Sequence, residues 1–343
     1  MGVEEEFLLL DPDGAVAPAA PDVMRRIGSD RRFKPEYMSY QLETATSVCT
    51  GLDELRRELI RLRLVAAQAA EKAGVYLIAS GAPPFPTGPL GALSHEDRYL
   101  KLAERFPEAT AIGGTCGCHV HIGIPDRELA TAVLSRIRPW LPVLLALTVN
   151  SPVTRAGDTG WDSFRYRAQL SWPTFRLPGV WPSAERYDQE IRSLVASGTA
   201  VDVSGIYFLA RLSARYPTIE VRVADTGLSV DDTVLFAGIT RALVATLIED
   251  IRRREKLLPA SGPLVSEQLL AVARGRAGQT ARLLTKITPQ LDAAGDTGEV
   301  YAGIERLRRE GTGARRQRHL WQKYGPTSGF IGALAAETVP ARI

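Results

Sequence analysis

The chain has 343 residues, of which 45% are hydrophobic and 24% charged, a composition typical of a globular protein with a sizeable core. Its 42 basic and 39 acidic residues leave a formal charge of +3 and are scattered, which argues against nucleic acid or a membrane surface as partner. Three cysteines are too few for a disulfide framework, and the N-terminus carries acids where a secretory signal needs a basic stretch. The most apolar segment, residues 140–149, contains Pro142 and is too short to span a bilayer. We expect a cytoplasmic protein.

Hydrophobic periodicity and turn residues predict the elements of the first half of the chain. We expect a strand over residues 3–10, a helix over 52–73 that ends before Gly74, and a buried strand over 75–80. A loop rich in Gly and Pro covers 81–91. A helix capped by Ser94 and Asp97 then runs to residue 106, and a strand lies within 113–124.

The second half reads as long helices around two further strands. A helix over 126–148 is expected to bend near Pro139 and Pro142, and a long loop over 150–182 is expected to be functional. A helix over 183–197, strands over 203–211 and 218–224, and a helix over 229–254 opened by Ser229 and Asp232 follow. The remainder is helical in character to the end. Strands without regular βαβ alternation indicate an α+β fold with an antiparallel sheet.

Three of the predicted strands carry polar residues that alternate with apolar ones. A sheet face built from them cannot be a dry core, because unpaired buried charges cost several kcal/mol each. That face is therefore either exposed to solvent or holds cations. The residues on it are Glu4 and Glu6 in the first strand, His119 and His121 in the second, and Glu220 and Arg222 in the third.

Each motif alone has a plain alternative, since an isolated E-x-E can lie on a wet sheet face and two neighbouring histidines can simply share a polar cleft. Their coincidence favours a site, and Glu36 and Glu43 add a third acidic pair. Carboxylates with an imidazole suit Mg²⁺ or Mn²⁺. Several converging carboxylates indicate more than one ion, the arrangement that clamps nucleotide phosphates. The sequence has no G-x-x-x-x-G-K-[ST] phosphate loop.

The ordered motifs resemble the signature of the type 2 glutamate-cysteine ligase family, the carboxylate-amine ligases. They are Gly2–Leu9, Glu36 with Glu43, Cys116–Gly123 and Glu220–Thr226, and the patterns at 313–318 and 337–338 extend the resemblance essentially end to end. The resemblance implies one catalytic domain over residues 1–343, with helices packed on one side of a glutamine-synthetase-like or guanidino-kinase-like sheet. It also implies that the γ-phosphate of ATP passes to a carboxylate, and that an amine then displaces phosphate from the acyl phosphate.

The resemblance assigns roles residue by residue. Glu4, Glu6, Glu43, His119 and Glu220, with Glu36 as a further candidate, are the implied ligands of two or three metal ions.

The arginines have implied roles with the substrates. Arg222, catalytic with Glu220, would neutralise the transferred phosphoryl group, because a guanidinium fork suits phosphate oxygens. Arg165 would hold the α-carboxylate of the amino acid donor. Further candidates are Arg167 and His121 for substrate and Arg316 for the nucleotide.

One departure leaves the substrates open: Trp161 stands where the family often has a tyrosine, and Ser171-Trp172-Pro173 replaces a plainer glycine-rich segment. The reaction is then glutamate-cysteine ligation or a specialised amide-forming step in secondary metabolism. The rivals are a metal-dependent hydrolase, which needs no nucleotide, and a non-catalytic descendant that binds a metabolite; a guanidino kinase fits the motif order poorly. The long apolar helices could form a two-fold interface in a homodimer.

Overall fold

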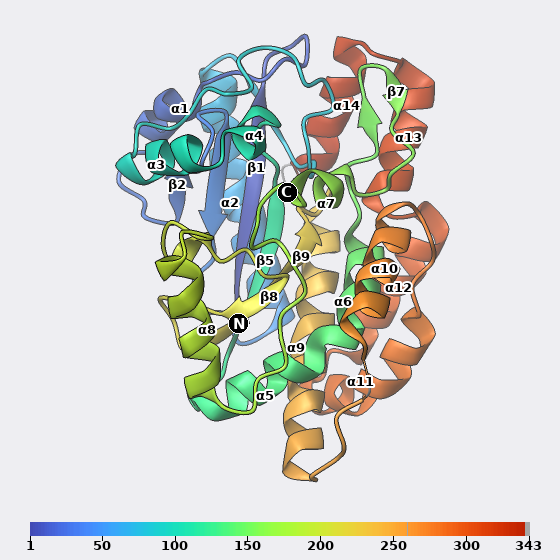
Figure 1. Ribbon diagram of the computed structural model, residues 1–343. Coiled ribbons are helices and arrows are strands. Elements are labelled where there is room, and N and C mark those ends of the chain that lie inside the picture. The colour runs from blue at the N-terminus through green and yellow to red at the C-terminus, as the bar shows by residue number, and fades with distance from the viewer. Residues whose placement is uncertain (259, 340–343) are drawn as a thin grey trace.

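The computed structural model describes residues 1–258 and 260–339, built around one antiparallel sheet (Figure 1). The strand order is β2-β3-β1-β5-β9-β8, and β4 pairs with the far end of β1 beyond β5. The strands are β1 (Gly2–Leu10), β2 (Phe33–Pro35), β3 (Gln41–Ala45), β4 (Tyr76–Ile78), β5 (Gly117–Gly123), β8 (Ala210–Leu212) and β9 (Thr218–Asp225). The antiparallel sheet and its packed helices confirm the predicted fold class.

The strand register lines up the polar residues across the sheet. Glu4 of β1 faces His119 of β5, and His121 of β5 faces Glu220 of β9. The β5–β9 register shifts between Cys118 and Val120, where β9 has one extra residue. Since side chains alternate between the two faces of a strand, these polar residues share one face of the sheet.

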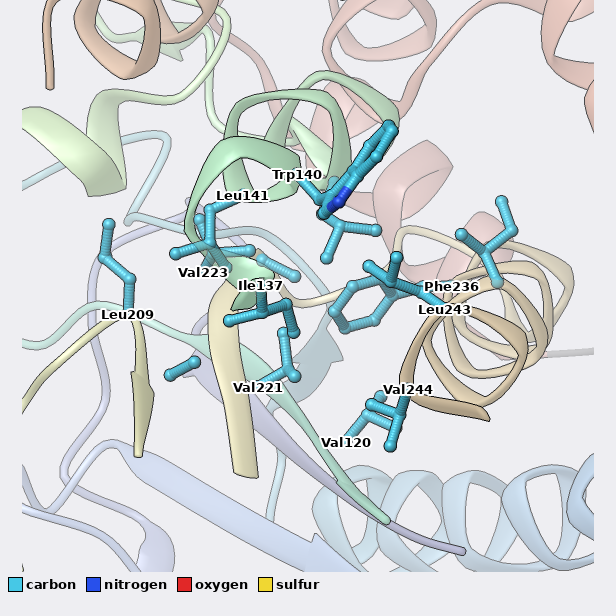
Figure 2. Packing of buried hydrophobic residues seen from close by; sticks show 14 of the residues in the cluster. Val120, Ile137, Trp140, Leu141, Leu209, Val221, Val223, Phe236, Leu243 and Val244 are labelled. Carbon is cyan, nitrogen blue, oxygen red and sulfur yellow. The ribbon is translucent and has the colours of Figure 1, made fainter. Parts of the chain in front are cut away.

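The opposite face of the sheet is the apolar core of the protein. Val120 of β5 and Val221 of β9 are fully buried there and pack with Phe236 and Val244 of α9 (Val230–Arg252) (Figure 2). Helices α5 (Arg127–Ile137) and α6 (Leu141–Thr148), with the short η1 (Arg138–Trp140) between them, complete this core. Of the C-terminal helices, orange to red in Figure 1, α11 and α12 pack on α9, α10 packs on α6 and α7, and α13 and α14 pack on each other. They are α10 (Gly262–Ala273), α11 (Thr280–Ala294), α12 (Thr297–Glu310), α13 (Gly313–Tyr324) and α14 (Ser328–Thr338).

The stretch Arg127–Thr148 is long and apolar enough to cross a membrane by length and composition alone. In the structure 67% of its most apolar window is buried inside the protein, where α5 and α6 pack against the sheet. Arg127–Thr148 is therefore a core segment of this fold. The predicted bend is confirmed, since α5 ends at Ile137 and α6 begins at Leu141.

A buried ion pair ties β1 to three distant segments. Arg63 of α2 (Leu52–Lys72) and Glu5 of β1 are both fully buried, and Nε of Arg63 donates to Oε2 of Glu5 at 3.1 Å. The same guanidinium donates to the carbonyls of Gly227, Leu228 and Thr338. Successive side chains of a strand point to opposite faces. Glu5 therefore lies on the core side of β1, whereas its neighbours Glu4 and Glu6 lie on the polar face.

Several predicted elements need correction. The strand predicted over 203–211 is a short 3₁₀ turn, η2 (Val203–Gly205), followed by β8, whose three residues begin only at Ala210. The helix predicted from Ser94 is α3 (Asp97–Arg105), and Ser94 does not cap it, because its hydroxyl donates to the carbonyl of Glu36 instead. The capping pair of Ser229 and Asp232 is confirmed.

The sequence did not predict α1 (Ala20–Ile27), β2 or β3, all in the first 45 residues. The long loop over 150–182 contains the hairpin of β6 (Val153–Thr154) and β7 (Gly157–Asp158) and the helix α7 (Phe164–Gln169). The remaining helices are α4 (Pro107–Ala111) and α8 (Ala184–Ala196). The end of the predicted helical tail, residues 340–343, lies outside the described residues.

Candidate active site

Carboxylates and imidazoles converge at the centre of the polar face. Nδ1 of His119 lies 3.3 Å from Oε2 of Glu4, and Nε2 of His119 lies 3.7 Å from Oε1 of Glu6. Nε2 of His121 lies 3.6 Å from Oε2 of Glu4 and 4.0 Å from Oε1 of Glu220. One potential ligand atom from each of Glu4, His121 and Glu220 lies within 4.8 Å of the others. The three strands thus deliver their polar side chains to one place.

Like charges are crowded at the edge of this group. Burial and the neighbouring Glu36 raise the pKa of Glu6 to about 7, although the backbone N–H of Gly117 donates to Oε2 of Glu6 at 2.6 Å. Burial and the charge of Glu4 raise the pKa of the Glu43 carboxyl well above its ordinary value. A cation among these oxygens would relieve both costs.

The His119 imidazole is in the form that can bind a metal. Burial and the Arg222 guanidinium lower the pKa of His119 to about 3, so the ring is neutral at neutral pH. The Nε2 atoms of His119 and His121 are buried and have no hydrogen-bond partner among the described residues. Buried polar atoms are rarely left unpaired, so carboxylates with two such imidazole nitrogens fit a divalent cation.

At each end of the row of acidic residues across the sheet, a basic residue on the neighbouring strand pairs with the last carboxylate. At one end Nζ of Lys34 lies 2.8 Å from Oε1 of Glu43, the residue it faces across β2 and β3. At the other end Arg211 of β8 faces Glu220 and donates to both of its oxygens, at 2.8 and 3.2 Å. Burial would raise the pKa of the Glu220 carboxyl, but Arg222 and Arg211 outweigh it and lower the pKa.

Sequence reasoning missed Lys34 and Arg211. The sequence signal for Arg211 is the alternation Ala210-Arg211-Leu212, in which the polar residue stands between two apolar ones. The importance of Arg211 follows only from the β8–β9 register, which places it opposite Glu220.

A two-lobed cleft lies above the polar face. The outer lobe is open and holds about 1370 Å³, and the inner lobe holds about 660 Å³, both counted with the solvent at their mouths. Acidic residues form the floor of the outer lobe and basic residues surround them. The residues that line both lobes, and so mark their junction, are Glu6, Glu36, Arg98, Tyr99, His119, Tyr207 and Arg222.

Arg222 lies at this junction with its guanidinium held in place. Its Nη1 atom donates to Glu220 and lies 3.2 Å from Nδ1 of His119. The register shift between β5 and β9 places Arg222 opposite His119, so the guanidinium stands between the acids of the outer lobe and the inner lobe.

Arg165 forms the inner end of the cleft. Its side chain is 4% exposed, its Nε atom has no hydrogen-bond partner among the described residues, and its Nη1 lies 3.9 Å from Oδ1 of Asp225. Gly117 makes room for it, because a Cβ atom there would stand 2.4 Å from Nη2 of Arg165. Asp225 is itself fixed by the hydroxyls of Ser151 and Ser163, at 2.8 and 2.7 Å.

Glu36 borders both lobes, and the hydroxyl of Tyr99 donates to its Oε2 at 3.4 Å. It lies after β2 and outside the row of the sheet, which distinguishes it from the other predicted metal ligands.

Arg167 and Arg316 are not brought together with the other predicted site residues. Arg167 is exposed and packs over the rings of Trp161 and Phe164, because α7 turns Arg165 inward and Arg167 outward. Arg316 of α13 pairs with Asp232 and, at 3.1 Å, with Oε2 of Glu337. Both residues are absent from the lining of either lobe.

The two departures from the family pattern fall in different places. Trp172 lines the inner lobe, with edge-to-face contacts to Tyr37, Phe106 and Tyr207 at 5.8, 5.7 and 5.2 Å between ring centroids. Trp161 lies outside both lobes and packs under Arg274. Of the two tryptophans, Trp172 is therefore the one that lines the cleft.

An acidic, imidazole-bearing sheet face with arginines on both sides has the residue types with which enzymes handle phosphate and metal ions. The family model for glutamate-cysteine ligase family 2 matches residues 1–337. A protein of Mycobacterium sp. (strain KMS), provisionally named glutamate–cysteine ligase 2-2, is 39% identical over 368 residues, covering 99% of this chain and 98% of the relative. A protein of Salinispora tropica, provisionally named glutamate–cysteine ligase 2, is 39% identical over 360 residues, covering 99% and 95%.

Solved structures share the fold at low sequence identity. The glutamate–cysteine ligase of Francisella tularensis, solved in complex with AMP, aligns with a TM-score of 0.70 at 13% identity, covering 99% of this chain and 89% of that one. A bifunctional glutathione synthetase from Pasteurella multocida aligns with a TM-score of 0.72 at 15% identity, covering 97% and 51%. The family model and the sequence relatives identify the chain as an ATP-dependent carboxylate-amine ligase. The chain belongs to glutamate-cysteine ligase family 2.

Proposed function

We propose that this ligase activates the side-chain carboxylate of a glutamate-like amino acid as an acyl phosphate and transfers the acyl group to an amine. The observation that carries this proposal is the two-lobed cleft, whose lobes meet at Glu6, His119 and Arg222. The open outer lobe, with its acidic floor and basic surroundings, suits a metal-bound triphosphate. The inner lobe, which ends at Arg165, suits an amino acid.

The reaction takes place in two steps at the junction. A carboxylate oxygen of the donor forms a bond to the γ-phosphorus of ATP as the bond from that phosphorus to ADP breaks. The nitrogen of the amine then forms a bond to the acyl carbon, the bond to phosphate breaks, and the nitrogen loses a proton.

The divalent ions would be held by the carboxylates of the polar face and one imidazole. The donors we assign are Glu4, Glu6, Glu43, His119 and Glu220, with Glu36 at the junction. Mg²⁺ bound there would neutralise charge on the phosphate oxygens. We propose that two or three ions bind.

Arg222 neutralises the transferred phosphoryl group in this scheme. Phosphoryl transfer depends on positioning and on charge neutralisation, and Arg222 is already oriented by Glu220 and His119. Arg165 holds the α-carboxylate of the donor, since its Nε is unpaired in a buried pocket and a carboxylate is the usual partner of a guanidinium fork.

Glutamate and cysteine are the first donor and acceptor to test, because the relatives bear the name of glutamate–cysteine ligases. Trp172 in the inner lobe is the reason to test other amines beside cysteine, including those of specialised metabolism. We further propose that residues 1–343 work as one catalytic unit; a homodimer and a cytoplasmic location stay predictions.

The test is release of ADP and phosphate from Mg-ATP over a matrix of amino acid donors crossed with amine acceptors. Release that needs both partners, with an amide of matching mass, supports the proposal and names the substrates. A Glu220→Gln protein purified in the same way is the control for contaminating ATPases. Hydrolysis of an amide without ATP, with no ATP consumption in any combination, would instead support a metal-dependent hydrolase.

A further inference from the structure

The turn between β8 and β9 carries two side chains that the proposed reaction leaves without a role. Arg215 and Tyr216 stand at the mouth of the outer lobe, and both are exposed. The acidic floor and Arg222 lie deeper in the same lobe, so a triphosphate whose terminal phosphates reach Arg222 extends its nucleoside toward this turn.

Arg215 is a basic residue at this mouth whose charge is uncommitted. Seven arginines and lysines line the outer lobe, and among the described residues only Arg215 and Arg31 of these form no ion pair. The others are paired: Arg32 with Asp30, Lys34 with Glu43, Arg98 with Asp202, and Arg211 and Arg222 with Glu220. A guanidinium beside a phosphate path with no protein partner is suited to bind phosphate.

Tyr216 offers an aromatic surface next to His121. The residue is 60% exposed, and its ring meets the ring of His121 edge-to-face, with 6.3 Å between centroids and 87° between planes. No parallel-stacked protein ring covers it among the described residues. An exposed aromatic face stacks on nucleobases with a substantial gain in affinity.

The turn holds both side chains in a defined place. The hydroxyl of Ser213 accepts hydrogen bonds from the backbone N–H groups of Arg215 and Tyr216, both at 3.3 Å. The N–H of Ser213 donates to the carbonyl of Thr218 at 3.0 Å, which closes the turn onto β9. Because β9 also carries Glu220 and Arg222, the turn leads directly into the strand that holds the proposed phosphoryl-transfer residues.

We propose that the β8–β9 turn binds the nucleoside end of ATP, with Tyr216 stacked on the purine base and Arg215 on the phosphate nearest the ribose. The inference rests on the proposed function, which puts the nucleotide in the outer lobe. Arg31, on the wall formed before β2, is then outside the nucleotide path.

The experiment measures the Kd of Mg-ADP by calorimetry and KM for ATP in the ligation assay, for the full chain and its variants. We expect Arg215→Ala to weaken nucleotide binding about tenfold. Tyr216→Ala should weaken it at least about fivefold, whereas Tyr216→Phe should keep parental affinity, because stacking needs the ring and not the hydroxyl. For both alanine variants kcat and KM for the amino acid donor should stay near parental values.

Arg155→Ala in the β6–β7 turn and Tyr301→Ala on α12 are matched controls, exposed residues outside the cleft. Loss of nucleotide affinity in Arg31→Ala but not in Arg215→Ala would overturn the proposal and put the nucleoside on the opposite wall. Parental nucleotide affinity in Tyr216→Ala would overturn it as well. A parental protein that binds no Mg-ADP and consumes no ATP would instead overturn the proposed function itself.

Discussion

Adding one methyl group at Gly117 tests whether Arg165 acts from its present position. A Cβ atom there would stand 2.4 Å from Nη2 and 3.0 Å from Cζ of Arg165. The guanidinium must retreat by about 1 Å to reach contact distance, and the end of a side chain gives way more easily than a central strand. Misplacing a substrate-positioning group by about 1 Å costs on the order of 100-fold in rate. We therefore expect Gly117→Ala to lower kcat/KM for the donor acid by about 100-fold with the fold intact.

The assay is steady-state ADP release at varied donor concentration, with circular dichroism to verify folding. Gly123→Ala is the matched control, because Gly123 ends the same strand and a Cβ atom there meets nothing within 4 Å. Equal donor kcat/KM in the two variants would refute the role of Arg165. A loss in Gly117→Ala confined to KM for ATP would show that the damage passed through Glu6, which accepts from the N–H of Gly117.

Three further outcomes follow from the same contacts. Arg222→Lys keeps the charge but loses the fork, so kcat should fall on the order of 100-fold while Mg-ADP binds as before; unchanged kcat would remove Arg222 from the mechanism. Mg²⁺ should raise the Tm of the parental protein, a chelator should reverse this, and Glu220→Gln should shrink the rise; an equal rise in both would remove Glu220 from the metal site. Arg63→Met strands Glu5 in the interior and should lower the free energy of unfolding in urea by about 3–5 kcal/mol. The exposed neighbour change Arg61→Met should cost no more than about 0.5 kcal/mol, and equal losses would contradict a special role for the buried pair.

The long strands of the site could be predicted because alternation is a local property. β1, β5 and β9 each have seven or more residues, and the alternation of strand side chains between two faces alone puts Glu4 with Glu6, and His119 with His121, on one face. The capping pair of Ser229 and Asp232 is equally local, and the structure confirms it.

The short elements could not be predicted, because their existence depends on neighbours distant in the sequence. β2 and β8 have three residues each and are strands only because β3 and β9 pair with them. Lys34 and Arg211 were missed for this reason, because each belongs to the site only by pairing with the carboxylate opposite it on the next strand. The direction of α7 likewise depends on tertiary packing, which decides that Arg165 enters the cleft and Arg167 does not.

The run Glu4-Glu5-Glu6 shows why charge alone is a poor guide to function in a strand. Strand alternation sends Glu4 and Glu6 to the cleft, where they lie beside imidazoles, and sends Glu5 to the core, where Arg63 takes its charge. The hydroxyl of Thr233 donates to Glu5 at 2.6 Å as well, so β1 is anchored to α2 and α9 at this residue. A slip of β1 by one residue would exchange the two faces and bury the cleft acids without partners. The buried pair therefore fixes the register on which the whole polar face depends.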